Sequence, residues 1–140
     1  MCDRYAKRTF AFFERTVLRT LGALAVLVVG AVHLEQYYAV HFNVVPTIGP
    51  LFLLNFVGAT LIGLGLLIPL ERMRPLHVLL SLGGIGLAAT SFVFLFVSEH
   101  RLVFGFQDYG YRPAIIVALA AEAAAVLLLG GYLASRARGA

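Results

Sequence analysis

Apolar residues dominate four stretches of the chain, at about 18–38, 51–70, 76–98 and 113–133, and short polar segments separate these stretches. Each stretch has about 20 residues, and a helix that rises about 1.5 Å per residue then crosses a hydrocarbon core of about 30 Å. Polar and apolar residues do not alternate within the stretches, which argues against the strands of a membrane barrel. Because lipid offers no hydrogen bonds to the backbone, the pattern predicts four transmembrane helices.

The composition of the chain agrees with this pattern. Of its 140 residues, 61% are hydrophobic and 13% are charged, and the mean hydropathy is +0.91. A soluble domain of this size could not cover so much apolar surface. We expect one membrane domain at 18–135, preceded by residues 1–17 and followed by a tail at 136–140. Because the connections are short, the sequence predicts an all-α, up-down-up-down bundle of four transmembrane helices.

Positive charge gathers on one side of the four spans. Nine of the eleven Lys and Arg residues lie there, and only Arg101 and Arg112 lie on the other side, in the third loop. The positive-inside rule then places both termini in the cytoplasm, in a plasma (inner) membrane of bacterial type. No run of basic residues points to nucleic acid, so the partner we expect is the lipid bilayer. The nine residues are Arg4, Lys7, Arg8, Arg15, Arg19, Arg72, Arg74, Arg136 and Arg138.

Residues 1–17 have the pattern of an amphipathic helix. On a helical projection the basic residues share one face, and apolar side chains occupy the opposite face. Such a helix suits the surface of an anionic inner leaflet, and we expect it to lie in the interface before turning into the first span. A cleaved secretory signal is the alternative, with Leu21–Val32 as its apolar core. The basic face holds Arg4, Arg8, Arg15 and Arg19, and the apolar face holds Ala6, Phe10, Phe13 and Val17.

Small residues recur at four-residue intervals in the spans. Transmembrane helices approach one another closely where Gly, Ala, Ser and Thr form such a row. These rows therefore predict the faces through which the four helices pack. They are Gly22, Val26 and Gly30 in the first span, where Val26 interrupts the small residues, Ala59 with Gly63 in the second, Gly84 with Ala88 in the third, and Ala114 with Ala118 in the fourth.

Polar side chains extend these rows. His33 and Tyr37 continue the row of the first span, so His33 should point into the bundle, whereas Glu35 lies about 200° away and should reach the outer headgroups. Asn55 is in register with the row of the second span, and Thr90 and Ser91 are the polar residues within the third.

Glu122 extends the row of the fourth span and lies near the bilayer midplane. An isolated charge at that depth costs several kcal/mol or more, so Glu122 should be protonated or partnered, and His33 is the natural partner. The sequence therefore predicts a polar pocket for a small ligand, a cation or a proton in the outer half of the bilayer. Its predicted members are His33, Tyr37, Asn55, Ser91 and Glu122.

Familiar catalytic and metal-binding sets are missing from the sequence. No Ser-His-Asp set, phosphate-binding glycine loop or pair of carboxylates at one depth is present, so we do not expect an enzyme. The single Cys2 forms no internal disulfide, and His33 and His41 lie about 12 Å apart along a helix, too far to share a metal. The sequence does not identify a cofactor. One alternative is a redox protein that binds a quinone, or a haem held by His33 and His100. The loop residues with metal-binding side chains are His41, Glu99, His100 and Asp108.

The second span carries one family resemblance. From Asn55 to Gly63 it reads N-x-x-G-x-x-x-x-G, which resembles the corresponding helix of the small four-helix fluoride channels, and the chain length is also similar. In the third span, Thr90-Ser91-Phe92 is loosely similar to their Phe- and Thr-rich break. The resemblance covers about nine residues and implies a small ion channel. That family forms antiparallel dimers without a strong charge bias, whereas this chain has a marked one.

These observations favour a small binding or transport protein with Glu122 as its protonatable group. The main alternative is a non-catalytic subunit or assembly factor whose Gly and Ala faces pack against a larger membrane complex. A single bundle of four helices is too narrow to enclose a transport pathway easily. We therefore expect a homo-oligomer or a larger membrane complex in either case.

Overall fold

The computed structural model describes residues 2–69 and 74–138, with side chains from residue 12 onward. It contains the helices α1 (Cys2–Ala39), α2 (Ile48–Leu67), α3 (Arg74–Ser98) and α4 (Pro113–Ala137), and one turn of 3-10 helix, η1 (Phe42–Val44). Helices α2, α3 and α4, and the Phe12–Ala39 part of α1, are each long and apolar enough to cross a membrane. The prediction of an all-α four-helix membrane protein is therefore confirmed.

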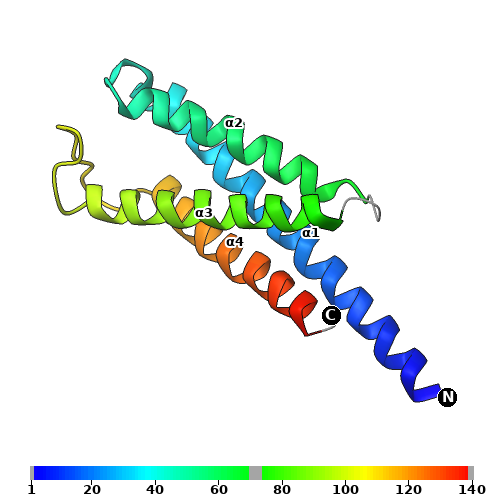
Figure 1. Ribbon diagram of the computed structural model, residues 1–140. Coiled ribbons are helices and arrows are strands. Elements are labelled where there is room, and N and C mark those ends of the chain that lie inside the picture. Colours follow the sequence, from blue (N-terminus) through cyan, green and yellow to red (C-terminus); the bar gives the residue numbers. More distant parts are fainter. Residues whose placement is uncertain (1, 70–73, 139–140) are drawn as a thin grey trace.

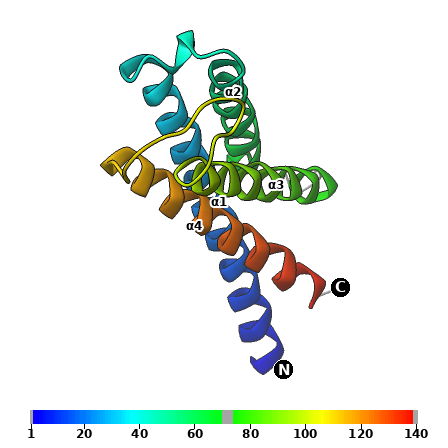
Figure 2. The ribbon, with the colours of Figure 1, turned by 90° about the vertical axis from the view of Figure 1, so that its left-hand side faces the viewer.

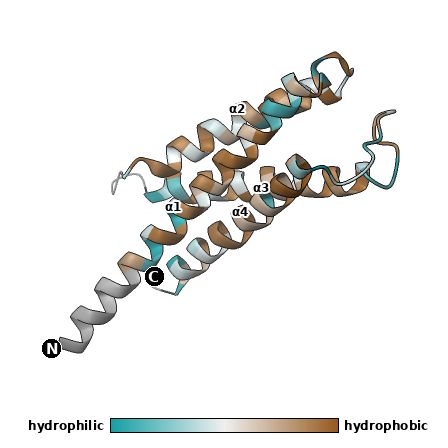
Figure 3. Cartoon of the chain, turned by 180° about the vertical axis from the view of Figure 1, so that it is seen from behind, coloured by the Kyte–Doolittle hydropathy of each residue, from teal (hydrophilic) through white to brown (hydrophobic). Residues whose placement is uncertain are grey.

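The four helices form an up-down-up-down bundle (Figures 1 and 2). Helix α1 packs against α2 and α4, and α3 packs against the same two helices from the opposite side. Both ends of the chain lie at one end of the bundle, which we call the termini end. Segments 40–47 and 99–112 lie at the opposite end, the loop end. Hydrophobic residues cover most of each helix, and hydrophilic residues gather toward the helix ends and in the loop at 99–112 (Figure 3).

Helix α1 differs from the prediction for residues 1–17. We expected an interfacial helix that turns into the first span at residue 18, but α1 runs for 38 residues without a break. At about 1.5 Å per residue it is about 57 Å long, well beyond a hydrocarbon core, and its N-terminal part projects past the other helices (Figure 1). Its placement in the interface stays a prediction. Predicted features that lie outside the described residues or side chains are Cys2, Arg4, Ala6, Lys7, Arg8, Phe10, Arg72 and residues 139–140.

Prolines set the boundaries of α2. The ring of Pro69 disfavours helical geometry at the residue before it, and Ile68 is extended with ψ 118°. The helix therefore ends at Leu67 and not at residue 70. At its start, Pro50 lies in the first turn, where a missing backbone N–H costs nothing, so α2 begins at Ile48 and not at residue 51.

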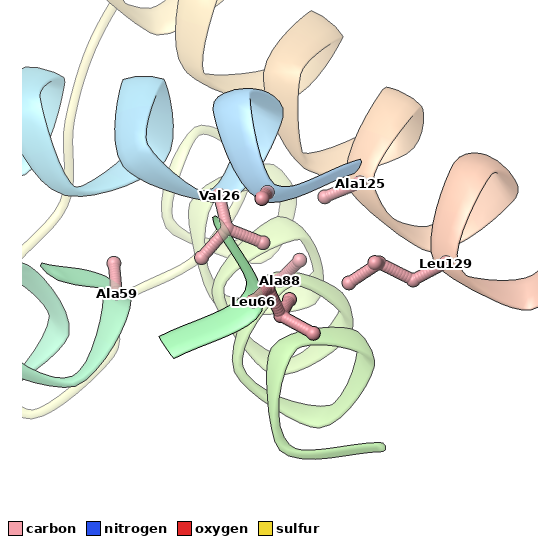
Figure 4. Packing of buried hydrophobic residues seen from close by; sticks show 7 residues of the cluster. Val26, Ala59, Leu66, Ala88, Ala125 and Leu129 are labelled. Atoms are coloured by element: carbon pink, nitrogen blue, oxygen red, sulfur yellow. The ribbon is translucent and has the colours of Figure 1, made fainter. Parts of the chain in front are cut away.

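The small-residue rows form the helix contacts, as predicted. A methyl group built on Gly30 would lie 2.9 Å from the Cβ of Ala59 in α2, and one on Gly84 would lie 2.9 Å from a methyl of Leu129 in α4. Only glycine allows these backbones to approach so closely. Beside these contacts lies an apolar core that is fully buried and includes Ala59 and Ala88 from the rows (Figure 4). This core consists of Ala23, Val26, Ala59, Leu66, Ala88, Ala125 and Leu129.

The contact at Gly30 gives the first prediction. Gly30→Ala should lower the free energy of unfolding by about 1–3 kcal/mol, because the added methyl meets the Cβ of Ala59, which no side-chain rotation can move. The measurement is reversible denaturation in detergent micelles, followed by circular dichroism.

Gly86→Ala is the matched control on α3, since a methyl there would meet nothing within 4 Å. It should be neutral, or stabilise by up to about 1 kcal/mol through helix propensity. Equal stability changes in the two variants would contradict the packing described for α1 and α2.

Candidate functional site

His33 points from α1 into the bundle, as predicted, and is only 6% exposed. Its Nδ1 lies 2.8 Å from the carbonyl oxygen of Val29, and its Nε2 lies 3.0 Å from the Oγ of Ser91 in α3. A carbonyl only accepts hydrogen bonds, so in the neutral ring the Nδ1 carries the hydrogen and the Nε2 is the acceptor. Ser91 then donates its hydroxyl hydrogen to His33.

Glu122 lies opposite on α4 and is fully buried. Neither of its carboxylate oxygens has a hydrogen-bond partner among the residues that the structure describes. The hydroxyl group of Ser91 lies beside the Glu122 carboxyl group. Ser91 therefore lies next to both His33 and Glu122. No hydrogen bond in the described part of the chain joins His33 to Glu122 directly.

Tyr37 and Asn55 do not contact the cluster of His33, Ser91 and Glu122. Tyr37 is half-buried and packs edge-on against Tyr38, with ring centroids 4.9 Å apart. Asn55 is also half-buried, and its Oδ1 has no partner within residues 12–69 and 74–138. Thr90 is exposed on the outside of α3. The structure thus brings together three of the five predicted pocket residues.

A cavity of about 20 Å³ lies on the loop-end side of His33. This volume accommodates one water molecule, whereas sites for organic ligands have volumes of several hundred Å³. The polar residues of the wall are His33, Gln36 and Asp108. The rest of the wall is apolar and consists of Val32, Phe42, Phe52, Leu95, Ala114, Ile115 and Ala118.

Phe42 covers this cavity at the loop end. The Phe42 ring is only 6% exposed and packs edge-on against Phe52 and Phe106, at centroid distances of 5.0 and 5.2 Å. The guanidinium of Arg112 lies 5.7 Å from the Phe42 ring centroid and donates to Asp108 at 2.7 Å. The ring is buried because η1 turns it back over the bundle.

The sequence does not single out Gln36 or Asp108 for the pocket. Gln36 follows His33 by three residues, so helical periodicity alone places the two on one face, and this signal was available. Asp108 lies in a loop, and its position depends on how the segment at 99–112 folds over the helix ends.

A second polar cluster lies at the termini end and contains His77, which the sequence does not single out either. The Nη1 of Arg19 donates to the carbonyl oxygens of Leu66 and Ile68, at 2.6 and 3.2 Å. The Nε2 of His77 lies 3.0 Å from the same Ile68 oxygen. The last carbonyls of a helix lack partners within the helix, so these side chains cap α2.

The metal and haem alternatives each need ligand side chains that lie close together, and the described residues do not provide such a set. No group of three His, Cys, Asp or Glu side chains that could hold a metal occurs within the described ranges. Both nitrogens of His33 are engaged. His100 is exposed in the loop, with its Nδ1 2.8 Å from the Phe96 carbonyl oxygen, whereas His33 is buried inside the bundle.

Comparison of the chain with protein-family models, curated proteins and solved structures finds no match. The resemblance of α2 to the fluoride channels therefore gains no support. Helix α3 also runs without interruption from Arg74 to Ser98, whereas the resemblance suggests a break near Thr90.

Ser91 and its exposed neighbour give the second prediction. Ser91→Ala should lower the free energy of unfolding by about 1 kcal/mol, because it leaves the buried His33 Nε2 without its donor. Denaturation in detergent measures the stability. The ¹⁵N chemical shift of His33 Nε2 reports the lost hydrogen bond.

Thr90→Ala is the control, since it removes a hydroxyl from the adjacent but exposed position. It should change stability by less than about 0.5 kcal/mol and leave the His33 signal in place. An unchanged Nε2 shift in Ser91→Ala would show that the hydrogen bond is not formed.

Proposed function

We propose that this membrane protein is a small proton-binding transport protein and that Glu122 is the group that takes up the proton. The observation that carries the proposal is the complete burial of Glu122 with no hydrogen-bond partner for either oxygen in the described part of the chain. An ionised carboxylate in that environment costs several kcal/mol, so the resting site holds the neutral acid. Ionisable groups inside membranes commonly mark proton or ion pathways.

Ser91 provides a route for proton exchange between Glu122 and His33. In the neutral arrangement Ser91 donates to the Nε2 of His33, and the neighbouring Glu122 carboxyl group has no hydrogen-bond partner among the described residues. Proton exchange therefore requires Glu122 to turn its acid hydrogen toward the Ser91 oxygen. When the Glu122 proton moves to the Ser91 oxygen, the hydroxyl proton of Ser91 moves to the Nε2. The products are a carboxylate and an imidazolium joined through the same hydroxyl, so no proton is gained or lost.

The two ends of the bundle differ in their access to this group. Toward the loop end, the cavity beside His33 begins about one helical turn from Glu122. Toward the termini end, the apolar core begins at Ala125 and reaches Leu129, about 10 Å along α4 from Glu122 (Figure 4). We infer that the site takes up protons from the loop end and that transport requires the apolar core to open.

Charge asymmetry assigns the loop end to the outside. The positive residues gather at the termini end, which the positive-inside rule places in the cytoplasm of a bacterial-type plasma membrane.

The cavity supports a proton as the cargo, because its volume of about 20 Å³ is too small for an organic ligand. The apolar outer faces of a bundle this thin support assembly as a homo-oligomer or with a larger complex.

Glu122→Gln gives the third prediction. In proteoliposomes with a potential across the membrane, wild-type protein should acidify the interior, as reported by a trapped pH-sensitive dye. Glu122→Gln should abolish this flux, because an amide of the same shape cannot release a proton. Infrared difference spectra between low and high pH should show a protonated-carboxyl band that is missing from the variant.

Glu14→Gln is the control, since Glu14 is a partly exposed carboxylate at the termini end, 4.0 Å from Arg138. It should retain both the flux and the infrared band. Absence of flux from the wild-type protein would refute transport. If Glu122→Gln fails to accumulate in the membrane or loses a co-purifying protein, the residue is structural and the chain is a subunit or assembly factor.

A further inference from the structure

We propose that the cavity beneath Phe42 holds one water molecule that links Asp108 to Gln36, and that Asp108 is the group through which protons enter from the loop end. This inference rests on the proposed function, because it supplies the entry step for the site at Glu122.

An unpartnered acceptor in the cavity wall indicates the water. Gln36 is only 6% exposed, and its Nε2 donates to Glu35, at the outer side of α1. Its Oε1 is buried without a hydrogen-bond partner in the part of the chain that the structure describes. A buried amide oxygen left unsatisfied costs about 1–3 kcal/mol. One water in a cavity of about 20 Å³ meets that need without any rearrangement.

Asp108 offers the second polar contact for this water. It lines the same cavity, and its side chain is 13% exposed, so it touches both the cavity and the solvent. Its backbone N–H donates to the Ser98 carbonyl oxygen at 3.1 Å, which fixes the loop to the end of α3. One carboxylate oxygen accepts from Arg112 and the other from the backbone N–H of Tyr109. Each oxygen has a second lone pair, so a water can still donate to Asp108.

His33 connects the cavity to the buried site, because it lines the cavity and also contacts Ser91. For an inward transfer, Asp108 first takes a proton from solvent and gives it to the water. The His33 ring rotates so that its unprotonated Nε2 leaves Ser91 and faces the cavity, where it accepts a proton from this water. After the ring rotates back, the Nε2 gives that proton to the Ser91 oxygen, and the Ser91 hydroxyl proton moves to the Glu122 carboxylate. Each intermediate group ends with its original number of protons, and Glu122 gains one.

Arg112 and Phe42 control access to this entry. The ion pair with Arg112 orients Asp108, and the same guanidinium lies over the Phe42 ring. Phe42 lines the loop-end side of the cavity and is almost fully buried against Phe106 and Arg112. A smaller side chain at residue 42 should therefore admit water to the cavity without passing through Asp108.

The test is the rate at which the Glu122 carboxyl group exchanges hydrogen for deuterium in the full-length protein in lipid. The protonated-carboxyl infrared band, identified by its loss in Glu122→Gln, shifts when D₂O replaces H₂O. Asp108→Asn should slow this shift at least about tenfold, since the amide cannot relay a proton. Phe42→Ala should accelerate it, and should restore fast exchange when combined with Asp108→Asn.

Glu99→Gln is the control, because Glu99 shares the loop but does not line the cavity. It should exchange at the wild-type rate, and circular dichroism establishes that each variant is folded. Exchange at the wild-type rate in Asp108→Asn would overturn the role of Asp108. That result is distinct from the absence of any band that depends on Glu122, which would instead refute the proposed function.

Discussion

The hydrogen bond between Ser91 and His33 crosses the centre of the bundle and joins two helices that scarcely pack against each other. Helices α1 and α3 lie on one diagonal, and α2 and α4 fill the gaps between them. Lipid offers no substitute partner for a buried imidazole or hydroxyl, so this bond has to form inside the protein. Glu122 lies beside Ser91. Helices α1, α3 and α4 therefore each contribute one residue to the same polar cluster.

Close helix packing makes this cluster possible and also isolates it. Glycine and alanine bring the helices together on the termini-end side of Glu122, where the core is apolar and fully buried. On the other side the packing loosens enough to leave a cavity for one water, with Gln36 and Asp108 in its wall. The apolar core therefore separates the polar cluster at Glu122 from the second polar cluster at the termini end. This asymmetry supports a site that exchanges protons with one side of the membrane.

Helical periodicity predicted the inward position of His33 and of Glu122, because each extends a row of small residues along its own helix. It also allowed Gln36 to be placed beside His33, although the row of small residues pointed to Tyr37, four residues beyond His33. Periodicity failed for partners on different helices. The expected pair of His33 and Glu122 is separated by Ser91, and Asn55 stays outside the cluster, because rotation and sliding between helices decide which side chains meet.

The sequence by itself determined the class and the four spans, since about 20 consecutive apolar residues need a hydrocarbon environment. The sidedness stays a prediction from the charge bias. It also determined the packing faces, because only small residues let helices approach closely. Only the tertiary structure decided that α1 continues through residues 2–17, that Phe42 turns inward, and that Asp108 reaches the cavity. The last two depend on how loops fold over helix ends, and no periodic pattern in the chain encodes that path.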